Sequence, residues 1–147
     1  MRGLTAPVAD LTEGFEATCD RRLTGQGPVC VAVSGGGDST ALAWLAAQWA
    51  RRRGRALTLL NVDHQLNPGS AGWARDCEAL ATRLGAGFRG LRWDGAKPAT
   101  GLPAAARAAR HALLARAARE VGAQVVLMGH NRDDLAEAAV MRAEGAS

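Results

Sequence analysis

Residues 34–39 form a glycine-rich hexapeptide, SGGGDS, whose side chains and backbone suit phosphate chemistry. Consecutive glycines let the backbone turn sharply and come close to a ligand, so that several N–H groups can point at phosphate oxygens. The hydroxyls of Ser34 and Ser39 add donors, and the carboxylate of Asp38 is a ligand of the kind that Mg²⁺ prefers. The segment therefore predicts a site for a polyphosphate bound with Mg²⁺. Its six residues are Ser34, Gly35, Gly36, Gly37, Asp38 and Ser39.

Three other interpretations of this hexapeptide were compared with phosphate binding. A Walker A loop requires Lys and then Ser or Thr after its last glycine, whereas Asp38 follows Gly37 here. A dinucleotide fingerprint starting at Gly35 would require glycine or alanine where Thr40 stands. An ordinary strand-to-helix turn with a Ser or Asp cap needs fewer glycines than this segment has. Phosphate binding is the interpretation that uses all six residues.

Two further polar clusters follow apolar runs in the sequence. Asp63 and His64 come directly after one run, and residues 130–137 (HNRDDLAE) come after another. Asp134 and Glu137 are three residues apart, so on a helix both carboxylates would lie on one face, where they could bind an amine, accept its proton or help to hold Mg²⁺. The alternative is that the polar residues only end strands, and that the two acids only complement a helix dipole.

The elements that would position these clusters alternate between strand and helix. Because such alternation is typical of βαβ units, it predicts an α/β fold in which helices cover both faces of a parallel sheet. The carboxyl ends of parallel strands lie at one edge, so the three clusters should meet there in a single domain, residues 1–147. We expect four strands, at Pro28–Val33, Ala56–Val62, Gly87–Trp93 and Gln124–Met128, and helices at Leu11–Leu23, Thr40–Arg53, Ala71–Leu84 and Leu102–Val121, with Thr100 as a cap and a last helical stretch after the HNRDD segment.

Net charge, cysteine spacing and the absence of long apolar stretches limit the classes of protein to which this sequence could belong. A net charge of +4 would suit a polyanion such as RNA, but ordinary proteins are often as basic. The three cysteines, Cys19, Cys30 and Cys77, are widely spaced and include no C-x-x-C pair, which argues against a disulfide framework and a zinc knuckle. Neither a signal peptide nor a membrane span is expected, and the pattern predicts a cytoplasmic protein with no membrane partner.

Several of these motifs resemble one enzyme family. The hexapeptide resembles the SGGxDS loop of the PP-loop ATP pyrophosphatases, which cleave ATP between its α and β phosphates. Residues 62–66 (VDHQL), 104–110 (AAARAAR) and 129–137 (GHNRDDLAE) resemble, in order, segments of the tRNA(Ile)-lysidine synthases. The resemblance runs from about Val29 to Arg142, and it implies the Rossmann-like fold of the adenine nucleotide alpha hydrolases. His111 stands where the family has an aromatic residue.

The resemblance also implies roles for named residues. It assigns Asp63, His64 and His130 to ATP binding together with the hexapeptide, and Asp38 to the metal. It makes Arg110, rather than Arg107, the arginine at the active site, and Asp134 and Glu137 the residues that handle lysine. The implied partners are tRNA(Ile) with a CAU anticodon and free L-lysine.

The implied reaction is ATP-dependent ligation. The C2 oxygen of the wobble cytidine would attack the α-phosphate of ATP, and the lysine ε-amine would then displace AMP. Two alternatives stay open, a tRNA thiolation enzyme with the same loop and an ATP-binding module of weak or no activity. The second arises because family members continue beyond a point such as Ser147, so we expect the domain to be incomplete. A four-stranded sheet would leave an edge open, which favours a homodimer.

Overall fold

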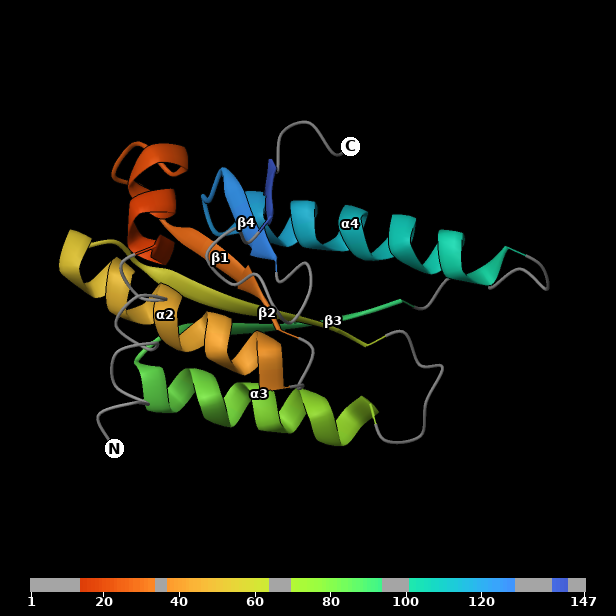
Figure 1. Cartoon of the computed structure of the whole chain (residues 1–147). Coiled ribbons are helices and arrows are strands. Elements are labelled where there is room, and N and C mark those ends of the chain that lie inside the picture. The colour runs from red at the N-terminus through yellow and green to blue at the C-terminus, as the bar shows by residue number, and fades with distance from the viewer. Residues whose placement is uncertain (1–13, 34–36, 64–69, 94–100, 129–138, 143–147) are drawn as a thin grey trace.

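A computed structural model describes residues 14–33, 37–63, 70–93, 101–128 and 139–142. It confirms the predicted alternation of strands and helices (Figure 1). A helix over residues 14–22 precedes the sheet. The remaining elements, in chain order, are β1 Val29–Ala32, α2 Gly37–Arg53, β2 Leu57–Asp63, α3 Ser70–Leu84, β3 Gly87–Arg92, α4 Leu102–Glu120, β4 Val125–Met128 and β5 Ala139–Arg142.

The strand order shows where a ligand would bind. The order is β3-β2-β1-β4-β5, and the first four strands are mutually parallel. The chain moves outward from β1 through β2 to β3 and then crosses back to place β4 on the other side of β1. This reversal makes the carboxyl ends of β1 and β4 the switch point of the sheet, which is where doubly wound sheets bind their ligands. In sequence, the hexapeptide follows β1 and the HNRDD segment follows β4.

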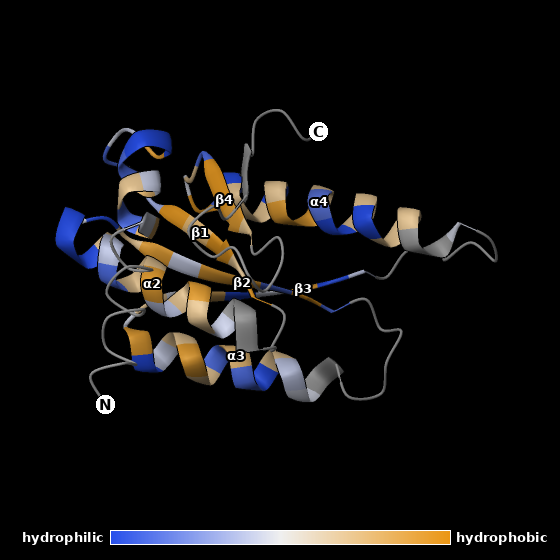
Figure 2. Ribbon diagram, viewed as in Figure 1, coloured by the Kyte–Doolittle hydropathy of each residue, from blue (hydrophilic) through white to orange (hydrophobic). Residues whose placement is uncertain are grey.

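Because successive side chains of a strand point to opposite faces, neighbouring residues of β1 pack into two separate cores. Val29 and Val31 pack with α2, α3 and the amino-terminal helix, whereas Cys30 and Ala32 pack with α4. Figure 1 accordingly shows α2 and α3 on one face of the sheet and α4 on the other. Figure 2 shows β1 and β4 as hydrophobic and the edge strand β3 as largely hydrophilic. Strands buried on both faces explain why the predicted runs are continuously apolar rather than alternating.

Helices α2 and α3 end where the sequence predicts, because each is followed by a glycine that adopts a left-handed conformation. Gly54 and Gly85 have φ values of +66° and +70°. The next residue then donates its backbone N–H back into the last turn, from Arg55 to the Ala50 carbonyl at 2.9 Å and from Ala86 to the Ala81 carbonyl at 2.9 Å. This pattern satisfies carbonyls that a helix end would leave unpaired. Within the described residues, no helix is long and apolar enough to cross a membrane.

Three expectations are wrong. Residues 139–142 form a strand, β5, which pairs antiparallel with β4, so the sheet has five strands and no helix continues to Arg142. The unpaired backbone groups at the β4 edge favour a paired strand over local helix propensity. β5 covers the β4 edge at which self-association was expected, while β3 and β5 are now the two edges of the sheet, and the homodimer stays a prediction. The N-cap of α4 is Gly101 rather than Thr100.

The amino-terminal helix is held against the end of α2 by a polar clamp. Asp20 accepts a hydrogen bond from Trp49 Nε1 at 2.9 Å and pairs with the guanidinium of Arg53 at 2.6 Å. Glu16 pairs with Arg52 at 2.8 Å. Beneath these contacts, Phe15 lies in the core shared with α2 and α3.

Replacing Asp20 with asparagine should lower the free energy of unfolding at neutral pH by a small amount, because the ion pair is exposed. The bonds from Arg53 and Trp49 lower the pKa of Asp20 from 3.8 to about 2. A folded-state pKa below the unfolded one stabilises the fold above pH 3.8, and this contribution is lost as the pH falls through about 2. Urea unfolding of both proteins at pH 7 and pH 2 should show a difference that is much smaller at the lower pH, where Asp20 is about half protonated in the folded state. An equal difference at both pH values would contradict the assignment.

Candidate active site at the carboxyl edge of the sheet

Val33, the residue that follows β1, is hydrogen-bonded to β2 through both its backbone N–H and its carbonyl. The backbone N–H of Val33 donates to the Leu60 carbonyl at 2.8 Å, and the Val33 carbonyl accepts from Asn61 Nδ2 at 2.9 Å. Ser34, Gly35 and Gly36 lie outside the described residues. The chain resumes at Gly37 as the first residue of α2, three residues before the predicted start at Thr40. Asp38 and Ser39 therefore occupy the first turn of α2, at its positive end.

Asp63 is the last residue of β2, as the sequence predicts within one residue. Its backbone carbonyl accepts from Trp93 N–H at 2.9 Å, and its register partner on β3 is Arg92. The Asp63 side chain is half-buried at the carboxyl edge of the sheet. His64, which was predicted beside it, lies outside the described residues.

The third predicted cluster belongs to the connection from β4 to β5. Met128, at the end of β4, pairs with Ala139, at the start of β5, so both ends of this connection are at the carboxyl edge. His130, Asp134 and Glu137 themselves lie outside the described residues, and their roles stay predictions. The structure thus brings together the strand ends from which the three clusters extend.

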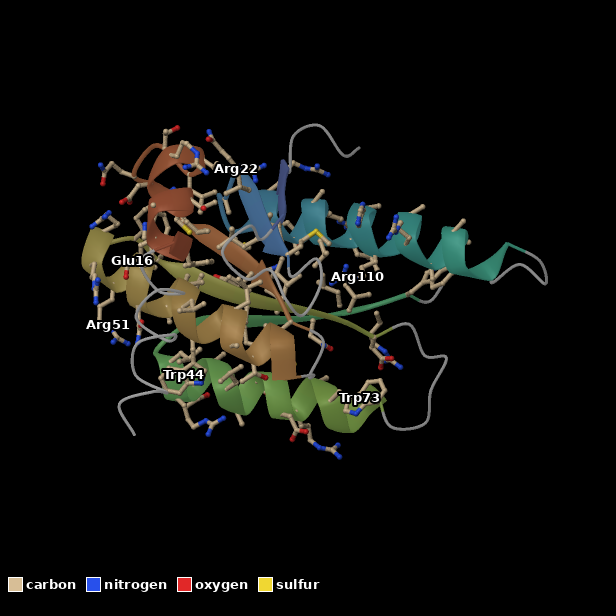
Figure 3. All side chains as sticks on the ribbon, in the orientation of Figure 1. Glu16, Arg22, Trp44, Arg51, Trp73 and Arg110 are labelled. Atoms are coloured by element: carbon tan, nitrogen blue, oxygen red, sulfur yellow. The ribbon has the colours of Figure 1, made fainter. Side chains whose placement is uncertain are left out.

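Arg110 is a predicted site residue whose side chain the structure describes. It is half-buried on α4, and in Figure 3 it extends from this helix toward the sheet. Burial lowers the pKa of Arg110, and the nearby Arg107 lowers it further. Within the described part of the chain, no hydrogen bond or ion pair engages Arg110. A guanidinium that is partly removed from water and has no anion among the described residues suits an anionic ligand.

Positive charge accumulates around Arg110. Burial lowers the pKa of His111, and the charges of Arg110 and Arg107 lower it further. Arg107 itself is exposed. The arrangement gives α4 one partly buried cation near the sheet and one in solvent, which makes the pair a natural comparison by mutation.

Some hollows on the described surface lie at the other edge of the sheet. One of about 190 Å³ is lined by residues 22–28 together with Arg55, Gly122, Gln124 and Val125, near the amino ends of β1 and β4. Arg55 there donates to the carbonyls of Leu23 at 2.6 Å and Gly27 at 2.7 Å, and its guanidinium carbon lies 5.3 Å from the Trp49 ring centroid. These contacts hold a turn, which explains the half-buried arginine there without a ligand.

The three cysteines lie on three different elements of the fold. Cys19 lies on the amino-terminal helix, Cys30 on β1 and Cys77 on α3, and all three are buried and free. Among the described residues, no group of three His, Cys, Asp or Glu side chains is arranged to hold a metal ion. The described cysteines therefore lend no support to an iron–sulfur or zinc site of the kind expected for thiolation enzymes.

The buried thiols should be almost unreactive in the folded protein. Burial is the main cause that raises the pKa of Cys19 and of Cys30 to about 12 each. Since the thiolate is the reactive form, about one part in ten thousand of each would be ionised at pH 8. We expect labelling by a disulfide reagent at pH 8 to be at least about a thousandfold slower than in urea. Fast labelling of two or more thiols without urea would refute this burial.

Comparison with known proteins places the chain in a family. It is 53% identical over 133 residues to a tRNA(Ile)-lysidine synthase of Caulobacter vibrioides, covering 89% of this chain and 33% of that protein. It is 58% identical over 114 residues to one of Bradyrhizobium diazoefficiens, covering 76% of this chain and 32% of that protein. The chain thus spans about a third of the length of these relatives.

A solved structure agrees with the fold. The U34-tRNA thiolase NcsA from Methanococcus maripaludis, with its [4Fe-4S] cluster, superposes with a TM-score of 0.73 at 15% identity, over 84% of this chain and 46% of that one. At this identity the likeness concerns the fold alone. The model of the family described as the PP-loop domain matches residues 10–147, which is nearly the whole sequence, and the chain therefore belongs to the PP-loop domain family.

Proposed function

We propose that this chain is the ATP-using domain of a tRNA(Ile)-lysidine synthase. The proposed reaction activates C2 of the wobble cytidine in tRNA(Ile) with a CAU anticodon and joins L-lysine to it, while ATP is split to AMP and pyrophosphate. The identity to lysidine synthases supports this substrate pair. The structural observation that carries the proposal is Arg110, a half-buried cation with no anion among the described residues, on the helix that leads into β4. ATP, tRNA and lysine are cytoplasmic substrates, so we place the protein in the cytoplasm.

In the first step, the cytidine C2 oxygen forms a bond to the α-phosphorus of ATP, and the bond from this phosphorus to the oxygen that bridges to the β-phosphate breaks. Pyrophosphate leaves. The backbone N–H groups of residues 34–39 would hold the β and γ phosphates at the positive end of α2. Asp38, an oxygen ligand in the first turn of that helix, fits Mg²⁺, which would neutralise phosphate charge when bound. Arg110 would stabilise the negative charge that develops on the α-phosphate.

In the second step, the lysine ε-amine attacks C2 of the adenylated cytidine. A C–N bond forms, the C–O bond to AMP breaks, and the amine loses a proton. Asp134 or Glu137 would accept this proton, and the other carboxylate would position the amine. Adenylation makes the step feasible because AMP is a far better leaving group than an oxide. Asp63, His64 and His130 would complete the nucleotide site.

The proposal is tested by measuring binding and turnover on the same protein. Calorimetry with Mg·ATP measures binding, and pyrophosphate release is then followed with tRNA(Ile) and lysine, omitting each in turn. Release that requires tRNA(Ile), with a lysine adduct detected on the tRNA by mass spectrometry, would support the proposal. Binding without release would instead identify the chain as an ATP-binding module, and the absence of any binding would refute the phosphate site.

A further inference from the structure

Asn61 is a buried polar residue within the apolar strand β2. Its exposed fraction is 4%, and it is the only polar or charged side chain that is buried among the residues that the structure describes. Burying an amide costs free energy unless its hydrogen-bonding groups find partners. An apolar residue of similar size would suit this position better if packing were its only task. The structure shows one specific contact that an apolar residue could not make.

That contact fixes the last peptide before the hexapeptide. Asn61 Nδ2 donates to the Val33 carbonyl at 2.9 Å, and the same nitrogen lies 3.7 Å from Cys77 Sγ. Because a carbonyl can only accept, the amide nitrogen rather than the amide oxygen must face Val33. Two acceptors, one on the residue after β1 and one on α3, hold the side chain in one orientation.

Asn61 lies on β2 directly after the last residue that pairs with β1, and it still pairs with β3. β2 pairs with β1 on one side from Leu57 to Leu60 and with β3 on the other side from Thr58 to Asp63. The β1–β2 ladder has its last pair at Ala32 and Leu60, so Val33 is the point at which the chain leaves it. From there, only residues 34–36 separate Val33 from the start of α2.

The planarity of the peptide group links this contact to the phosphate site. The Val33 carbonyl and the N–H of Ser34 belong to one rigid plane, so fixing the carbonyl direction also fixes the direction of that N–H. We propose that Asn61 is a positioning residue, which aims the first N–H group of the phosphate loop by holding the Val33 carbonyl. This inference rests on the proposed function to the extent that residues 34–39 bind phosphate. A misdirected donor would lose its phosphate contact without disturbing the adenosine part of the site.

The experiment compares Asn61→Leu with Leu57→Ala, a change at the opposite end of β2 that destabilises the core and lies far from the loop. Calorimetry measures the affinity of each protein for Mg·ATP and for adenosine. We expect Asn61→Leu to weaken Mg·ATP binding by about ten- to a hundredfold and adenosine binding by less than about threefold, as for a displaced binding group. Leu57→Ala should leave both affinities near those of the wild type. Asn61→His, whose Nδ1 can occupy the place of Nδ2, should restore part of the Mg·ATP affinity.

Unchanged Mg·ATP affinity in Asn61→Leu, or an equal loss for ATP and adenosine, would overturn the inference. A wild-type protein that binds no ATP would refute the proposed function instead. Hydrogen exchange of the backbone amides would then test separately whether Asn61 positions the loop. Residues 34–39 should exchange faster in Asn61→Leu than in Leu57→Ala at equal global stability. Equal exchange in the two variants would leave Asn61 with a purely structural role and refute positioning.

Discussion

Replacing Arg110 with alanine should reduce pyrophosphate release by about a hundred- to a thousandfold, the usual cost of removing one fixed group that stabilises transition-state charge. Binding of Mg·ATP should weaken much less, because the charge on the α-phosphate grows only as the reaction proceeds. The thermal midpoint should stay the same or rise. Arg110 is half-buried without a described partner, so its removal relieves a desolvated charge rather than breaking a contact.

The matched control is Arg107→Ala, which removes the same charge one helical turn away from an exposed position. It should change the rate by less than about threefold, since exposed charges are well screened. Arg110→Lys should recover only part of the activity, because lysine keeps the charge and loses the planar fork. If the two alanine variants lost activity equally, a general effect of positive charge on tRNA binding would explain the result, and Arg110 would have no specific role.

Replacing Asp38 with asparagine should abolish most of the benefit that Mg²⁺ gives to ATP binding. In the presence of Mg²⁺ the affinity for ATP should fall by about tenfold or more, which corresponds to about 1.4 kcal/mol. In the presence of a chelator, the affinity should be unchanged or slightly higher, because one negative charge near the phosphates is gone. Calorimetry with and without Mg²⁺ measures both affinities. Asparagine is preferred to alanine because it keeps a polar side chain in the first turn of α2.

The control for Asp38 is Asp76→Asn, which changes the net charge equally at an exposed position on α3. Its affinity for ATP should match that of the wild type under both conditions. If Asp38→Asn weakened ATP binding to the same extent with and without Mg²⁺, the carboxylate would serve the loop or the helix start rather than the metal.

Most of the secondary structure was predictable because its signals are local. Apolar runs, helical periodicity and the glycines after α2 and α3 each act within a few residues, and the predicted ranges agree closely with the structure. The exception is the end of the chain. Residues 139–142 carry no strong strand pattern, and they become β5 because β4 offers a free edge, a partner that only the folded sheet supplies.

Some features of the candidate site were likewise predictable from the sequence, and others depended on the folded structure. The sequence alone determined the glycine-rich loop and the order of the polar clusters after apolar runs, because residue type and spacing carry that information. It therefore predicts a site at the carboxyl edge of a parallel sheet. Only the tertiary structure decided that Asn61 holds the Val33 carbonyl and that Arg110 is half-buried without a described partner. Both depend on contacts between residues far apart in the chain: Asn61 is 28 positions from Val33, and the burial of Arg110 follows from packing α4 onto the sheet. A local sequence pattern carries no information about contacts between such distant residues.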